Sequence, residues 1–154
     1  VPEEYQQVGA GMCLTNLGKA NAWLLGEAFR RLEFPIDKVL TSATCRTRQH
    51  AEIMFKDAGQ ILVEPALIFG DIPNESQVSA THKMKKRLLK EHYKKNKNLV
   101  IIAHGRTAQE AGLVDFWQKQ GETLIFSKNL DSYELRAHLS TEHFIRMLPQ
   151  RVDW

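Results

Sequence analysis

The sequence has few of the features that mark specialised protein classes. Only two of its 154 residues are cysteines, Cys13 and Cys45, and neither has a CxxC neighbour, which excludes a disulfide framework and a cysteine zinc site but leaves one bridge between them open. Apolar runs all fall well short of the ~20 residues that a membrane-spanning helix needs. The dinucleotide fingerprint GxGxxG and the P-loop are missing, which disfavours a doubly wound nucleotide-binding domain. Low-complexity segments and internal repeats are missing too.

What is present is typical of one globular domain. The chain is 43% hydrophobic and 25% charged, and its length suits a single domain over residues 1–154 that buries most of its unfolded apolar surface. The net charge of +3 and pI of about 8.9 are mild. Composition sets neither the oligomeric state nor the compartment.

The excess positive charge is concentrated in one stretch, residues 83–97. Apolar residues recur there at helical spacing, which predicts an amphipathic helix with a cationic outer face. A solvated face is favoured over steering of an anionic substrate. Because no aromatic interleaving accompanies the charge, a nucleic-acid partner is not expected. The basic residues are Lys83, Lys85, Lys86, Arg87, Lys90, Lys94, Lys95 and Lys97.

Periodicity predicts alternating helices and strands. A long helix capped by Thr15 is expected to turn a stripe inward that consists of Leu17, Ala20, Leu24, Ala28 and Leu32, widened by Trp23, Leu25 and Phe29. The further expected elements are a strand at 38–41, a helix from 42 to 58, a strand at 61–63, a long connection at 64–79, a strand at 99–103, a helix at 108–114 capped by Thr107, and a hairpin of 123–127 with 132–139. This order predicts an α/β three-layer sandwich with a mixed, mainly parallel central sheet flanked by helices.

The predicted strand at 99–103 is followed directly by His104, and the other predicted elements are arranged around this point. The run LVIIA reads as a strand buried on both faces, and Gly105 permits a tight turn after it. Ligands of open α/β sheets bind beyond the carboxyl ends of the strands, so His104 is a candidate site residue. A core histidine bonded to a backbone carbonyl is the structural alternative.

A second chemical stretch is residues 40–51, LTSATCRTRQHA. A strand ending in hydroxyl residues and followed by a helix start with Arg46 suits an anion, because free amides and a planar guanidinium donate hydrogen bonds. Alone, Arg46 could equally be a surface residue. Both strands of a parallel sheet deliver their ends to the same edge, so we predict that Arg46 and His104 converge on one phosphate-sized anion.

These stretches resemble the histidine phosphatase superfamily, the phosphoglycerate mutase-like phosphatases. LTNLGKANAWLLGEAF and PIDKVLTSATCRTRQHA are similar to its patterns L-[ST]-x-x-G-x-x-Q-A and S-[SP]-x-x-R-[AT]-x-x-T-A. NLVIIAHG resembles the strand of the second catalytic histidine, and GETLIFSKNLDSYELRAHL the edge hairpin of the small bacterial branch. The resemblance implies that Arg46 binds phosphate and that His104 is the second pocket histidine, which hydrogen-bonds the phosphoryl oxygens.

The chain departs from the family at its nucleophile. The family's first strand ends in an R-H-G motif whose histidine accepts the phosphoryl group, and no such motif precedes Leu14. The other histidines do not replace it: His50, His82, His92, His138 and His143. Two explanations remain open: the segment lies ahead of Val1, so that the domain over 1–154 misses its first strand, or the protein has lost the nucleophile. The absence of this strand would leave an open edge beside residues 99–103 or 39–41, which favours the first explanation.

Smaller departures concern the other positions of the pattern. His50 stands where the family has Thr, and Ala43 stands where Pro is common. The acid that protonates the leaving oxygen has no clean match. Asp71 and Glu75 lie in the right connection and are the candidate proton donors, although each also suits a solvated loop.

The resemblance implies a phosphomonoester hydrolase that works through phosphohistidine with no metal and no cofactor. Its partner would be a phosphorylated small molecule or another phosphomonoester, which the sequence does not identify. The alternative is a catalytically inactive phosphate-binding or scaffold domain. The family pattern also places Cys13 at the start of the first helix and Cys45 beside Arg46, close enough to bridge if the protein is exported. Bacterial cytoplasm and periplasm both stay open as compartments.

Overall fold

The computed structural model describes residues 13–58, 60–64, 67, 88, 90–91, 94–130 and 132–148. Asp71, Glu75 and most of the predicted cationic helix therefore lie outside the described residues. The elements, in chain order, are α2 (Asn16–Arg31), β1 (Ile36–Thr41), α3 (Cys45–Phe55), β2 (Gln60–Val63), β3 (Asn98–Ile102), α5 (Thr107–Glu110), β4 (Thr123–Lys128), β5 (Tyr133–Leu139) and α6 (Thr141–Met147). None of the helices in these ranges is long and apolar enough to cross a membrane.

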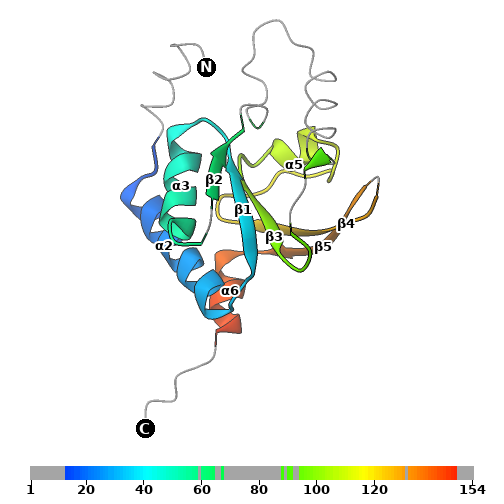
Figure 1. The fold of residues 1–154 in the computed structure, drawn as a ribbon. Coiled ribbons are helices and arrows are strands. Elements are labelled where there is room, and N and C mark those ends of the chain that lie inside the picture. The colour runs from blue at the N-terminus through cyan, green and yellow to red at the C-terminus, as the bar shows by residue number, and fades with distance from the viewer. Residues whose placement is uncertain are drawn as a thin grey trace, which may run out of the picture.

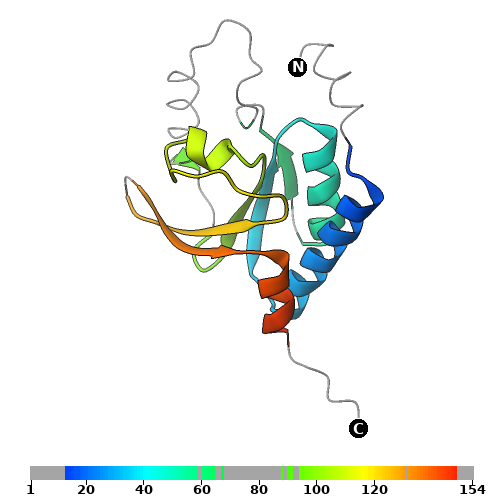
Figure 2. The same ribbon diagram turned by 180° about the vertical axis from the view of Figure 1, so that it is seen from behind.

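A parallel sheet forms the centre of the molecule, with strand order β2-β1-β3 (Figure 1). β1 is the middle strand, and its Val39, Leu40 and Thr41 are almost completely buried. Helices α2, α3 and α6 lie together on one side of this sheet, which both views show (Figures 1 and 2). The predicted α/β fold with a parallel sheet flanked by helices is confirmed.

The predicted hairpin exists as β4 and β5, which pair antiparallel. In the described residues it forms a two-stranded sheet of its own, so the central sheet there is purely parallel rather than mixed. β3 is consequently an edge strand of the described sheet, and Leu99 to Ile102 are only half-buried. Of the two open edges expected from the sequence, the one beside residues 99–103 is present, because β1 is paired on both sides.

Side chains of β1 alternate between two cores. Val39 packs with α2, α3 and α6 in a cluster that includes Phe55 and Phe144. Leu40, one residue later, points to the opposite face and packs with Leu67, Leu88 and Ala111. The sheet is thus covered on both faces, as a parallel sheet requires.

The predicted inward stripe of α2 is wrong in its first half. Leu17 and Leu24 are 71% and 39% exposed, and Ala20 and Trp23 are exposed as well. The buried residues are instead Ala22, Leu25, Gly26 and Ala28. The reason is close helix contact: a Cβ added at Gly26 would stand 3.0 Å from the Met54 Cα of α3, so the closest approach requires a small residue and leaves no room there for Leu17 or Leu24.

The ends of the helices follow local rules with one correction. Thr15 caps α2 as predicted, since its Oγ1 accepts the Gly18 N–H at 3.1 Å. The helix predicted at 108–114 is only the four-residue α5, which ends before Gly112 at φ 70°. Thr107 is the first residue of α5 and not its cap, because Arg106 holds that position. Helix α6, which sequence periodicity missed, begins with a capping box of Ser140 and His143.

Candidate functional site

The carboxyl ends of β1 and β3 lie side by side, which sets the position of the site. Thr41 pairs with Ile102 in the parallel register, and the Ser42 N–H donates to the Ile102 carbonyl at 3.2 Å. Ser42 and His104, the residues just beyond the two strand ends, are therefore neighbours. Helix α3 begins three residues after Ser42 and brings its first turn to the same place.

Arg46 and His104 meet at this edge of the sheet. Arg46 is in the first turn of α3, and its Nη2 lies 3.2 Å from Nδ1 of His104. Both side chains are half-buried. The structure thus brings together the two residues singled out from the sequence, while their binding of an anion stays a prediction.

Three hydroxyl side chains, Ser42, Thr44 and Thr47, complete the site and are here termed the hydroxyl cluster. Ser42 Oγ lies 2.9 Å from His104 Nε2, 2.7 Å from Thr47 Oγ1 and 3.2 Å from Thr44 Oγ1. Ser42 is fully buried and Thr47 is 3% exposed. Sequence reasoning noticed the hydroxyl-rich strand end but assigned these residues no part. The signal was the spacing TSATCRT, which places Ser42, Thr44 and Thr47 around the start of one helix.

The backbone around His104 is held by its own turn. The His104 N–H donates to Thr107 Oγ1 at 3.0 Å, and the Thr107 N–H donates to the His104 carbonyl at 2.9 Å. Gly105 is required by close approach, because a Cβ there would stand 2.4 Å from the Gln118 carbonyl oxygen. The loop after β3 therefore fixes where the imidazole can lie.

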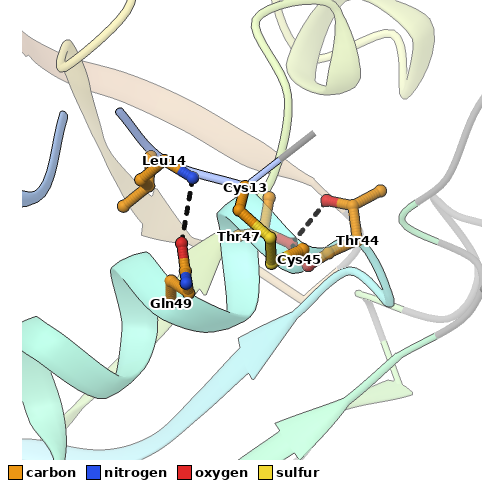
Figure 3. The surroundings of a disulfide bond; sticks show 6 residues. All are labelled: Cys13, Leu14, Thr44, Cys45, Thr47 and Gln49. Carbon is orange, nitrogen blue, oxygen red and sulfur yellow. Dashed lines mark hydrogen bonds between the residues drawn. A yellow bond between two sulfur atoms is a disulfide. The ribbon is translucent and has the colours of Figure 1, made fainter. Parts of the chain in front are cut away.

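A disulfide joins Cys13 to Cys45, which is the first residue of α3 and the neighbour of Arg46 (Figure 3). Their Cα atoms are 4.8 Å apart, so the prediction that the two residues lie close enough to bridge is confirmed. A second contact lies one turn along α3, where the Leu14 N–H donates to Gln49 Oε1 at 2.9 Å (Figure 3). The segment before α2 is thus attached to the helix that carries Arg46.

The remaining described histidines are engaged in other ways. His138 lies 2.9 Å from Glu122 Oε2, and its hydrogen bond lowers the pKa of that carboxyl. His143 belongs to the capping box of α6. His50, one turn beyond Arg46 on α3, has a buried Nε2 with no hydrogen-bond partner among the described residues, and burial lowers the pKa of its ring.

The chemistry of these side chains suits an oxyanion. Arginine has only donors, the hydroxyls can donate or accept, and the start of α3 adds the partial positive charge of a helix N-terminus. No carboxylate appears among the described contacts of Arg46, which would otherwise neutralise it. Within the same described ranges, no group of His, Cys, Asp and Glu could hold a metal ion.

Comparison with known proteins supports this chemistry. The profile of the family described as "Histidine phosphatase superfamily (branch 1)" matches residues 2–72. Over this segment, which is a little under half of the chain, the sequence is similar to the histidine phosphatase superfamily. The matched segment contains Arg46 and the hydroxyl cluster, whereas His104 lies beyond it.

A solved structure shares the fold of this chain. It is described as that of "a putative alpha-ribazole-5'-P phosphatase from Escherichia coli str. K-12 substr. MG1655", with a TM-score of 0.63 and 19% identity. The match covers 83% of this chain and 84% of the other. At this identity the likeness concerns the fold alone. No match was found among curated proteins.

Proposed function

We propose that the protein is a phosphomonoester hydrolase that works through a phosphohistidine intermediate, with Arg46 and His104 as phosphate-binding residues. The nucleophilic histidine would come from a strand ahead of residue 1. The observation that carries the proposal is the meeting of the Arg46 guanidinium and the His104 imidazole, 3.2 Å apart, beyond the ends of two adjacent parallel strands. The similarity of residues 2–72 to the superfamily supports the choice of phosphate over other anions.

The chemistry would proceed in two steps. The upstream histidine attacks phosphorus and displaces the alcohol, and water then attacks the phosphohistidine to release inorganic phosphate and free imidazole. Arg46 and His104 would stabilise the phosphoryl oxygens as charge shifts in each transition state. By comparison with oxyanion-hole donors, each would contribute roughly 3 kcal/mol, or about two orders of magnitude in rate.

The open edge of β3 offers a position for the strand that we propose ahead of residue 1. β3 has a strand partner on one side only within the described residues, and its apolar residues Leu99 to Ile102 are half-buried, although a run of this kind suits a central strand. A strand added parallel to this edge would end level with His104. Its last side chain would then face Arg46 across the site.

The second candidate is a phosphate-binding domain without turnover. It is favoured by the positions of His138 and His143, which are held by Glu122 and by the α6 cap and supply no nucleophile to the site. Under this alternative, Arg46 and His104 would bind phosphate, but water would have to attack it directly.

One experiment separates these candidates. The 154-residue chain and a form extended by an upstream R-H-G strand are assayed on an aryl phosphate, and phosphate binding is measured by calorimetry. We expect binding by both forms and turnover by the extended form alone. Arg46→Ala should abolish binding, whereas Arg48→Ala, an exposed arginine on the same helix, is the matched control and should not. Turnover by the 154-residue chain that disappears in His104→Ala would show that the nucleophile is misassigned.

A further inference from the structure

We propose that Ser42 is a positioning residue that fixes the tautomer and the orientation of His104 at the anion site. The inference rests on the proposed function, since it concerns the imidazole assigned there to the phosphoryl group. It goes further by assigning a direction to the hydrogen bonds that join this ring to Arg46 and Ser42.

The argument begins with Arg46. A guanidinium carries five N–H donors and no acceptor, so the nitrogen that faces it must offer a lone pair. Nδ1 of His104 lies 3.2 Å from Arg46 Nη2 and is therefore the acceptor. The imidazole in this arrangement is neutral and carries its proton on Nε2.

The Ser42 hydroxyl oxygen accepts the hydrogen bond from the Nε2–H of His104. Nε2 lies 2.9 Å from Ser42 Oγ, so the N–H donates and the hydroxyl oxygen accepts. The Ser42 hydroxyl hydrogen then points to Thr47 Oγ1, 2.7 Å away. Thr47 in turn donates to the backbone carbonyl of Ser42 at 3.0 Å or of Thr44 at 3.1 Å. The series of hydrogen bonds thus ends at a backbone carbonyl, which can only accept, so its direction is fixed.

This direction excludes a tempting alternative. A buried serine 2.9 Å from a histidine has the distance of a nucleophile and its general base. A base needs a lone pair on the nitrogen that faces the hydroxyl, which would put the ring proton on Nδ1 and point it at the donors of Arg46. Ser42 consequently orients His104 and does not attack the substrate.

Burial gives the contact its effect. Ser42 is fully buried, so water does not replace its hydroxyl when the side chain is shortened. Without it, Nε2–H loses its acceptor and the ring can change tautomer or rotate. Nδ1, which accepts from Arg46 in this arrangement and takes up a proton before it can donate to an anionic oxygen, would then no longer be fixed in place.

The test is the nitrogen NMR spectrum of His104 in the full chain, in which the two tautomers give different Nδ1 and Nε2 shifts. In the wild type at neutral pH we expect a single Nε2–H tautomer. In Ser42→Ala we expect mixed tautomers and about two- to tenfold weaker binding of inorganic phosphate, in line with the loss of one hydrogen bond. Ser127→Ala is the matched control, because it removes a strand hydroxyl bonded to Arg136, outside the site.

Each outcome separates this inference from the proposed function. A wild-type Nδ1–H tautomer overturns the inference, and this result needs no variant to fold. An unchanged tautomer in folded Ser42→Ala also overturns it, even if phosphate binds. Mixed tautomers in Ser42→Ala with no phosphate binding by any form would support the role of Ser42 and refute the proposed function.

Discussion

Reduction of the Cys13–Cys45 disulfide should lower the stability of the folded protein substantially. The bridge closes a loop with a sequence separation of 32 residues. In the chain-entropy treatment such a loop stabilises the folded state by about 3.7 kcal/mol at 25 °C, through the restriction of the unfolded chain. At about 2–4 °C per kcal/mol for a chain of this size, the melting temperature should fall by about 7–15 °C.

Thermal unfolding with and without a phosphine reductant measures this effect. The variant Cys13→Ser/Cys45→Ser is the control, because it should melt near the reduced wild type and respond to no reductant. Equal melting temperatures for oxidised and reduced wild type, with thiol titration confirming both states, would refute the reasoning. That result would mean that the unfolded chain already keeps the two cysteines close together, so that the bridge restricts it little.

Three further perturbations test the packing and charge of the fold. Gly26→Val should cost about 1–3 kcal/mol by overpacking against the α3 backbone, whereas Gly18→Ala, which meets mainly flexible side-chain atoms, should be neutral or stabilising in urea titrations. The depressed pKa of buried His50 contributes stability that is complete above the unfolded pKa of 6.5 and is lost as pH falls toward the folded pKa, so His50→Leu should flatten the stability profile on the acid side of pH 6.5. Lys38→Met should lower the melting temperature by removing a 2.8 Å ion-pair partner of buried Glu91, and adding Glu91→Leu should restore part of the loss.

Elements whose local pattern has one interpretation were predicted well. The run at 99–103 became β3, and the alternating stretches around residues 128–131 became the β4–β5 hairpin. The convergence of Arg46 and His104 also followed from sequence, because parallel strands end at the same edge whatever their side chains.

Features that depend on tertiary contact were not predictable in the same way. Hydropathy favoured Leu17 and Leu24 for the inner face of α2. The distance between α2 and α3 is set by Gly26, and a hydropathy scale does not identify glycine as a residue of a buried face. The role of Ser42 was hidden for a similar reason. Its partner His104 is 62 residues away, and only the register of β1 and β3 brings the two together.

The hydrogen bonds of the site have a consequence for selectivity. Arg46 donates one of its five N–H groups to a lone pair on His104, so an incoming ligand takes over this N–H only if it offers a better acceptor than the imidazole. An anionic oxygen does, because a charge-assisted hydrogen bond is about twice as strong as a neutral one. An alcohol or an amide gives Arg46 no gain over the imidazole. The site therefore selects its ligands first by charge and only then by shape.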